Sequence, residues 1–111
     1  MMKDLSEAPE GSVVILHGCA HNPTGCDPTR EQWVKIFKIL IGRKLFPIFD
    51  NAYQGFASGD PSYDGWAMRT FAETGAEMFV TQSYIAFEER ETCFQFEASI
   101  FFCLFLFKVL T

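Results

Sequence analysis

An amide, a carboxylate and a phenol stand in two short segments whose residue types suit the binding of a polar ligand. Asn22 lies in the segment AHNPTG, and Asp50 and Tyr53 lie in the segment FDNAYQGF. Each segment closely follows an apolar run, and in α/β proteins ligands bind just beyond the carboxyl ends of the strands. We therefore expect Asn22, Asp50 and Tyr53 to share one site.

A third apolar run adds a fourth candidate residue. Met78 to Val80 leads into the segment TQSY, which contains Ser83. If the three runs are parallel strands, their carboxyl ends meet at one edge of the sheet. Ser83 then lies at the same edge as the other three candidates.

Each candidate taken alone has an ordinary structural interpretation. Asn22, before a proline, is a typical turn residue, and Tyr53 is a typical amphipathic aromatic. Asp50 could cap the turn that follows it, and a lone serine at a strand end is usually structural. His21 has no paired carboxylate in the sequence, so packing within its loop is its simplest interpretation. Only the combination of residues indicates a site.

The cysteines give no evidence of a metal site or a disulfide framework. Cys19, Cys26, Cys93 and Cys103 form no C-x-x-C pair. A cluster of Cys19, His21 and Cys26 lacks the second cysteine pair of a typical zinc site. We expect no metal, and we expect these cysteines to be free thiols in a reducing compartment.

The elements that position these residues follow a strand, helix, strand, helix, strand pattern. We expect strands at Val13 to Leu16, Leu45 to Phe49 and Glu77 to Tyr84. The first is apolar throughout, which is typical of a parallel strand buried on both faces. Crossovers of this length imply right-handed parallel connections. The pattern predicts an α/β fold of three mostly parallel strands with crossover helices.

Two helices are expected between the strands. Asp27 could cap a helix that starts at Pro28, carries an apolar stripe at helical spacing and stops at Gly42. Asp64 could cap a second helix, from about Gly65 to Thr74.

Composition limits the function classes. The chain has 111 residues, 49% of them hydrophobic, which is enough for one small core. The net charge is −5 and the basic residues are scattered, so nucleic acid is not an expected partner. The N-terminus has no apolar core and little positive charge, so we see no signal or transit peptide and expect a cytoplasmic location.

The sequence changes character after Tyr84. More than half of the 13 phenylalanines lie beyond it, and the stretch from Ala98 to Phe107 is almost wholly apolar. Spanning a membrane needs roughly 20 such residues, so a membrane partner is not expected. Two interpretations stay open: a segment that binds a partner or a membrane surface, and a non-native ending such as retained intron or frameshifted sequence.

From about residue 2 to residue 84 the chain resembles the aspartate aminotransferases, class I/II aminotransferases that use pyridoxal 5'-phosphate (PLP) in fold type I. AHNPTG, DPTREQW, FDNAYQGFASGD and TQSY occur in the order and spacing of that family. The resemblance implies a fragment of the PLP-dependent transferase large domain, a partial three-layer sandwich. Residues 1–84 would be the partial large domain and residues 85–111 an unmatched Phe-rich segment.

The resemblance also implies roles for the candidate residues. Asp50 resembles the carboxylate that pairs with the pyridine nitrogen of PLP, and Asn22 and Tyr53 resemble the groups that hydrogen-bond its phenolic oxygen. Ser83 resembles a phosphate-binding serine. The lysine that anchors PLP covalently follows three positions later in the family, and here that position is Ala86.

The implied function is amino-group transfer between aspartate or glutamate and 2-oxo acids, part of amino acid metabolism, in a family that forms homodimers. With alanine at the lysine position, and with no match to the family's phosphate loop or substrate arginine, we expect the chain to be inactive alone, its PLP binding to be doubtful and normal dimers not to form. The alternative is a non-enzymatic scaffold protein with an apolar C-terminal segment for binding a partner or membrane.

Overall fold

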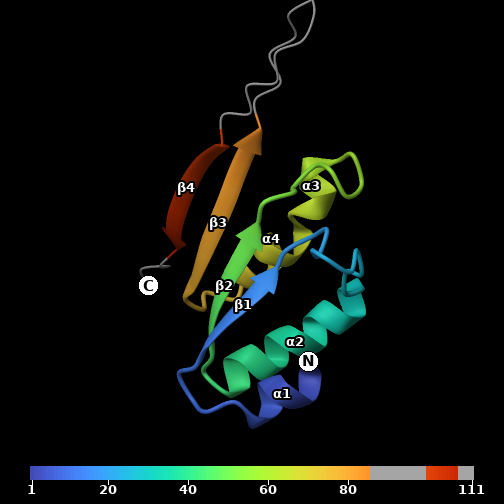
Figure 1. Ribbon diagram of the computed structural model, residues 1–111. Helices are drawn as coiled ribbons and strands as arrows, with labels where there is room; N and C mark the ends of the chain where they lie inside the picture. The colour runs from blue at the N-terminus through green and yellow to red at the C-terminus, as the bar shows by residue number, and fades with distance from the viewer. Residues whose placement is uncertain (86–99, 108–111) are drawn as a thin grey trace, which may run out of the picture.

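The protein is built around a four-stranded sheet with strand order β1-β2-β3-β4 (Figure 1). The computed structural model describes the backbone of residues 1–85 and 100–107 and the side chains of residues 1–82. Strands β1 (Val13–His17), β2 (Phe46–Asn51) and β3 (Met78–Ile85) are parallel. This confirms the expected α/β fold with three parallel strands.

A fourth strand, β4 (Ile100–Phe107), pairs antiparallel with β3. It comes from the apolar stretch for which the sequence predicted no secondary structure. An edge strand presents a row of unpaired N–H and C=O groups, and pairing satisfies those of β3. The stretch therefore extends the sheet.

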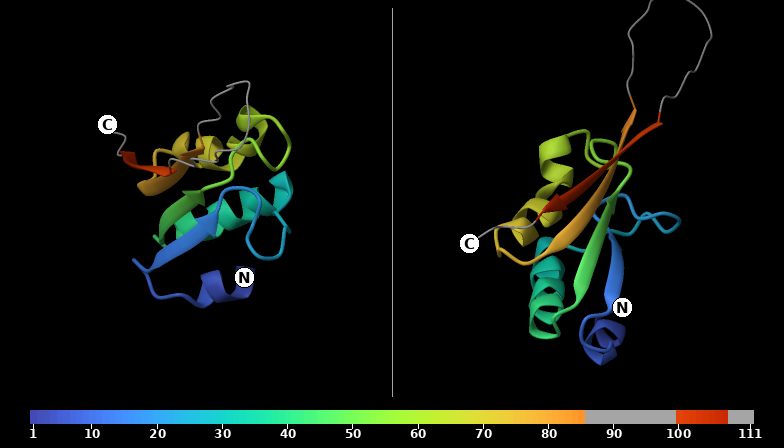
Figure 2. Two further views of the ribbon diagram at one scale, coloured as in Figure 1. Left: turned by 45° about the horizontal axis from the view of Figure 1, so that its top comes forward. Right: turned by 90° about the vertical axis from the view of Figure 1, so that its left-hand side faces the viewer.

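The helices are α1 (Met2–Glu7), α2 (Arg30–Gly42), α3 (Pro61–Asp64) and α4 (Trp66–Ala72). Helix α2 connects β1 to β2, and α3 and α4 connect β2 to β3. Two successive right-handed crossovers in the same direction place their helices on the same face. Accordingly α2 and α4 lie on one side of the sheet (Figure 2).

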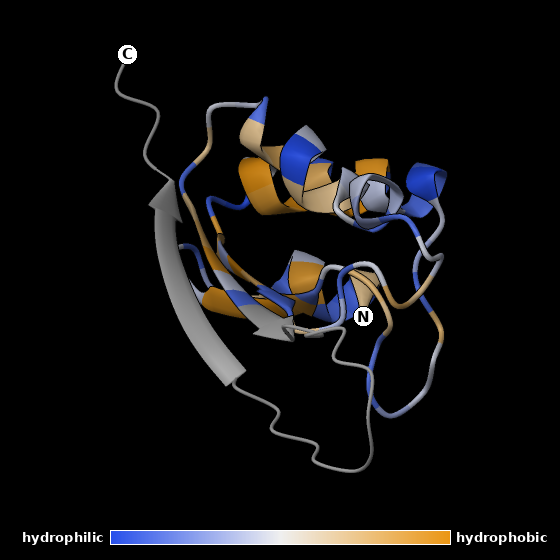
Figure 3. Cartoon of the chain, turned by 90° about the horizontal axis from the view of Figure 1, so that it is seen from above, coloured by the Kyte–Doolittle hydropathy of each residue, from blue (hydrophilic) through white to orange (hydrophobic). Residues whose placement is uncertain are grey.

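Most of the core lies between these two helices and the sheet, and α1 contributes Leu5 to it. Phe49 of β2 is fully buried, and its ring lies 6.1 Å from that of Trp33 in α2 and 5.6 Å from that of Phe71 in α4. Both crossover helices therefore pack on one strand residue. The helices carry hydrophobic and hydrophilic residues together, as amphipathic helices do (Figure 3). The core comprises Leu5, Leu16, Trp33, Ile36, Phe37, Leu40, Leu45, Phe49, Ala67, Phe71, Met78 and Val80.

The opposite side of the sheet, here called the open face, is less covered. Val13 and Ile15 of β1 are 61% and 67% exposed, so the predicted burial of this strand on both faces is wrong. Within the described part of the chain, the crossover helices cover only the other face. The open face continues across the sheet through residues in register with these two: Phe46, Ile48 and Phe79.

Pro47 is buried in β2, a strand with neighbours on both sides, although proline cannot donate to a ladder. The pairing explains how it is tolerated. Pro47 is in register with Val14 of β1, whereas the pairing of β2 with β3 begins one residue later, at Ile48.

Both predicted helix caps are wrong. Helix α2 starts at Arg30, and its cap is Thr29, which forms a capping box with Gln32. The second predicted helix is divided into α3 and α4, with Asp60 capping α3 through Ser62 N–H. Neither Asp27 nor Asp64 caps a helix, because loop N–H groups occupy both carboxylates. The predicted stop of α2 at Gly42 is confirmed.

The open face leads to a prediction about self-association. Large exposed apolar patches favour association, so replacing Val13 and Ile15 together by threonine should lower the apparent mass in sedimentation at high protein concentration. Threonine keeps the β-branched shape that suits a strand. Because both positions are exposed, the free energy of unfolding should change by only about 0.5 kcal/mol per site.

Phe49→Ala is the contrasting variant. It removes a fully buried ring and should cost about 3–5 kcal/mol. A wild-type chain that stays monomeric at all concentrations would contradict the association prediction.

Candidate functional site

The carboxyl ends of β1 and β2 and the middle of β3 bring polar side chains together on the open face. His17, Asp50 and Thr81 are in register across the three strands. The Thr81 hydroxyl donates to Asp50 Oδ1 at 3.2 Å. The first polar residue after the apolar run of each strand therefore lies in one row, with the carboxylate in its centre.

A cavity of about 130 Å³ lies beside Asp50. Three of the four residues predicted from the sequence, Asn22, Asp50 and Tyr53, line it. Tyr53 is 42% exposed, so the cavity is accessible from solvent. The remaining lining residues are His17, Cys19 and Ala52.

The fourth predicted residue is placed only by its backbone. Ser83 lies in β3 and is in register with Phe102 of β4. Its side chain lies outside the described part of the structure, and so does the whole of Ala86. The proposed roles of both positions stay predictions.

His17 and Thr81 were not singled out as site residues from the sequence. The signal that could have found them is positional, because each ends its apolar run with a polar side chain, at the same offset as Asp50. His17 Nδ1 accepts a hydrogen bond from the backbone N–H of Asn22 at 3.3 Å. The end of β1 thus contacts the loop that carries Asn22.

The loop between β2 and α3 carries Tyr53 and is held from inside by Asp64. One carboxylate oxygen of Asp64 accepts the backbone N–H groups of Gly55 at 2.8 Å, Ala57 at 3.1 Å and Ser58 at 3.4 Å. Asp64 is only 7% exposed. Burial alone would raise the pKa of this carboxyl, but the hydrogen bonds from Ser58, Gly55 and Ala57 outweigh it and lower the pKa.

A network of amides ties the same loop to the strand ends on the helix-covered face. Asn51, fully buried, donates to Gln54 Oε1, which also accepts from Gln82 Nε2 at 2.9 Å. Gln54 Nε2 donates to the Pro61 carbonyl at 2.8 Å. Each buried amide is therefore matched to a partner, as the cost of burying unpaired polar groups requires.

The buried thiol of Cys19 belongs to this network as well. Cys19 Sγ donates to Asn51 Oδ1 at 3.5 Å. Burial, with smaller contributions from the charges of Asp64 and Asp27, raises its pKa to about 11. Cys19 is therefore a protonated structural thiol at neutral pH, and not a nucleophile.

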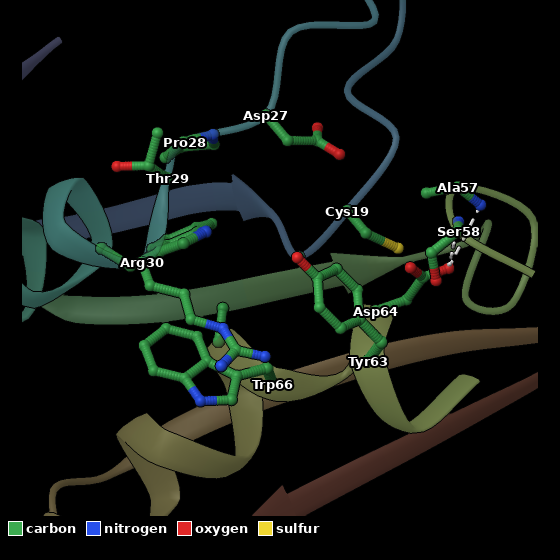
Figure 4. A pocket seen from close by; sticks show the side chains of 13 residues that line it. Cys19, Asp27, Pro28, Thr29, Arg30, Ala57, Ser58, Tyr63, Asp64 and Trp66 are labelled. Atoms are coloured by element: carbon green, nitrogen blue, oxygen red, sulfur yellow. Dashed lines mark hydrogen bonds between the residues drawn. The ribbon is translucent and has the colours of Figure 1, made fainter. Parts of the chain in front are cut away.

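A larger cavity, of about 260 Å³, lies between α2 and the loop that follows β2 (Figure 4). The Arg30 guanidinium carbon lies 5.0 Å from the ring centroids of both Tyr63 and Trp66. Of the residues that line the smaller cavity, only Cys19 also lines this one. The smaller cavity is the candidate site, because it holds the carboxylate, the amide and the phenol.

No group of three or more histidine, cysteine, aspartate or glutamate residues is arranged to hold a metal ion within the residues described. His21 Nδ1 lies 2.7 Å from the Thr24 hydroxyl inside its own loop. This is the loop-packing role expected for His21.

The model of the family "Aminotransferase class I and II" matches residues 1–84. The chain belongs to the class I and II aminotransferases. The match covers β1, β2 and most of β3, with the helices between them and the cavity residues Asn22, Asp50 and Tyr53.

Relatives within the family include cytoplasmic aspartate aminotransferase of Caenorhabditis elegans, 59% identical over 83 residues, which are 75% of this chain and 20% of the relative. Other curated relatives are named as chloroplastic and mitochondrial aspartate aminotransferases. The chain spans about a fifth of the length of these relatives. It is a fragment of the aminotransferase domain.

Solved aminotransferase structures share the fold. Aspartate aminotransferase from Trypanosoma cruzi superposes with a TM-score of 0.74 at 57% identity, over 75% of this chain and 21% of that one. An aromatic-amino-acid aminotransferase from Burkholderia pseudomallei, described as covalently bound to pyridoxal phosphate, superposes with a TM-score of 0.71 at 38% identity, over 74% and 20%. The family is PLP-dependent.

These matches do not favour the alternative of a non-enzymatic scaffold. In the part of the chain that the structure describes, no helix has the length and apolarity to cross a membrane.

The lowered pKa of Asp64 gives a prediction about stability and pH. A carboxyl whose pKa is lower in the folded than in the unfolded state stabilises the fold above its unfolded pKa, and this contribution is lost as the pH falls through the folded value. Asp64→Asn should therefore cost about 2 kcal/mol at pH 7 and progressively less in acid. Chemical denaturation between pH 7 and pH 3 measures the difference.

Asp60→Asn is the control for that experiment. Asp60 lies in the same loop, and its carboxylate accepts one backbone N–H group, that of Ser62, at 2.8 Å. An Asp64→Asn cost that does not shrink on acidification would contradict the role assigned to the Asp64 charge.

Proposed function

We propose that this chain provides the part of an aspartate aminotransferase that binds the ring of PLP. The observation that carries the proposal is the placement of Asn22, Asp50 and Tyr53 around one cavity at the carboxyl ends of β1 and β2. Asn22 comes from the loop after β1, Asp50 from the end of β2 and Tyr53 from the loop that follows it. Asn22 and Asp50 are 28 residues apart in the sequence. Packing of the core alone does not require them to meet.

The residues present fit the ring of the cofactor. A cavity of about 150 Å³ accommodates a benzene ring in another protein, and the cavity here is about 130 Å³. When bound, PLP supplies an electron sink for the charge that develops at the α-carbon of an amino acid. That chemistry depends on a protonated ring nitrogen.

Asp50 is suited to hold that proton. Its carboxylate accepts one described hydrogen bond, from Thr81, and has further acceptor positions for a ring N–H. An anion beside the ring nitrogen favours the charged, protonated form. Thr81 orients the carboxylate from the neighbouring strand.

Asn22 and Tyr53 are suited to donate to the phenolic oxygen of the ring. Among the described residues, neither the side-chain amide of Asn22 nor the hydroxyl of Tyr53 has a hydrogen-bond partner, although both line the cavity. The backbone N–H of Asn22 donates to His17, and this leaves the Asn22 side-chain amide available to a ligand.

The described lining of the cavity contains no lysine or arginine, so it has no positive charge to bind the phosphate of PLP. We assign Ser83 to the phosphate on the resemblance of TQSY. We also assign to the intact protein an amino acid and a 2-oxo acid as substrates and a homodimeric assembly. A cytoplasmic location is proposed as well, as named for the Caenorhabditis elegans relative, although other relatives are named as chloroplastic and mitochondrial.

The test of ring recognition uses pyridoxine 5'-phosphate, which has an alcohol in place of the aldehyde and cannot condense with surface lysines. We expect saturable binding to the full chain by calorimetry. Asp50→Asn should weaken it about 10-fold or more, because a hydrogen bond to a charged group contributes about 1.5–3 kcal/mol.

Asp60 does not line the cavity, so Asp60→Asn serves as the control and should bind like the wild type. Equal affinity of the Asp50→Asn variant and the wild type, or no binding by either, would overturn the assignment of this cavity to the ring.

This chain alone should not catalyse transamination. The position matching the PLP-anchoring lysine is Ala86, and general acid/base catalysis by one such group contributes typically 10²- to 10⁴-fold. Transamination of aspartate with 2-oxoglutarate should not exceed that of free PLP. Ala86→Lys alone should not restore it, since the described lining of the cavity contains no lysine or arginine for the phosphate. Saturable turnover by a homogeneous preparation would contradict this expectation.

A further inference from the structure

We propose that Asp27 is a positioning residue that holds the loop from Ala20 to Cys26 in the conformation that places Asn22 at the cavity. The inference deepens the proposed function and rests on it for the role of Asn22. Asp27 itself does not line the smaller cavity, so it acts through the loop and not on the cofactor.

The carboxylate of Asp27 binds the start of the loop with both oxygens. Oδ2 accepts the backbone N–H of Ala20 at 2.6 Å, and Oδ1 accepts the N–H of His21 at 2.8 Å. Both hydrogen bonds are charge-assisted and short. Two successive backbone groups are thus fixed by one side chain.

The first of these backbone groups belongs to a residue in an unfavourable conformation. Ala20 has φ of 49°, in the left-handed region where residues other than glycine are uncommon. Such a conformation persists only where the surrounding structure holds it. The hydrogen bond from Ala20 N–H to Asp27 Oδ2, at 2.6 Å, is a contact that can hold this conformation.

The turn at Ala20 decides where the next residues go. The His21 carbonyl accepts the N–H of Gly25 at 2.7 Å, which closes the loop, and the His17 and His21 rings lie 4.7 Å apart. Asn22 is the next residue, and its backbone N–H donates a hydrogen bond to His17 Nδ1. The cavity position of Asn22 is therefore the result of the turn that Asp27 fixes.

A helix-capping role does not account for Asp27. The cap of α2 is Thr29, whose side chain and that of Gln32 form a complete capping box. The carboxylate of Asp27 is directed to the loop that precedes it. Helix stability and loop geometry therefore depend on different residues two positions apart, and Thr29 offers a matched control.

The experiment compares Asp27→Ala, Asp27→Asn and Thr29→Ala in the full chain, with pyridoxine 5'-phosphate as the probe. Asp27→Ala should weaken binding about 10-fold. Asp27→Asn, which keeps one acceptor oxygen, should show a smaller loss. Thr29→Ala should lower the melting temperature but change the dissociation constant less than twofold.

A second measurement tests the placement without any ligand. In the wild type, the nuclear Overhauser effect between the amide proton of Asn22 and the ring of His17 should be present, because the two nitrogens lie 3.3 Å apart. It should be lost or weakened in Asp27→Ala and retained in Thr29→Ala. If Asp27→Ala does not fold, Asp27→Asn decides the outcome.

The two measurements separate the two hypotheses. A wild type that does not bind the probe, with the Overhauser effect still dependent on Asp27, overturns the assignment of the cavity to PLP and supports the positioning role. An Overhauser effect that survives in Asp27→Ala overturns the positioning role. So does a loss of binding in Thr29→Ala as large as that in Asp27→Ala.

Discussion

The candidate site depends on one constraint, the parallel pairing of β2 with β1 and with β3. This pairing puts His17, Asp50 and Thr81 in one row and brings the loops that follow β1 and β2 to the same edge. The pairing is in turn stabilised by Phe49, against which both crossover helices pack. Phe49, which holds the helices against the sheet, and Asp50, which lies at the candidate site, are thus adjacent residues of β2.

The sequence was sufficient to predict the three parallel strands, the helical connections between them and the meeting of the cavity residues. Apolar runs separated by helical stripes indicated parallel strands, and the polar residues after those runs necessarily lie at one edge. This argument needs only connectivity. It therefore placed Asn22, Asp50 and Tyr53 together without any knowledge of side-chain contacts.

Three features could not be predicted, because each depends on groups distant in sequence. Asp27 and Asp64 precede helical segments and have the local pattern of caps, but loop N–H groups six or more residues away bind them. The exposure of Ile15 depends on which helices cover the sheet. The strand character of β4 depends on the free edge of β3, which no pattern within the apolar stretch reveals.

Asp50 and Asn51 are adjacent in β2, yet they serve opposite sides of the sheet. The carboxylate lies with the row on the open face, and the amide is buried in the network beneath. Because side chains alternate along a strand, a shift of one residue exchanges the two faces. Deleting a single residue of β2 before Asp50 would keep the strand but turn the carboxylate into the protein and the amide toward the cavity. The length of β2 is therefore as much a part of the site's chemistry as the identity of its residues.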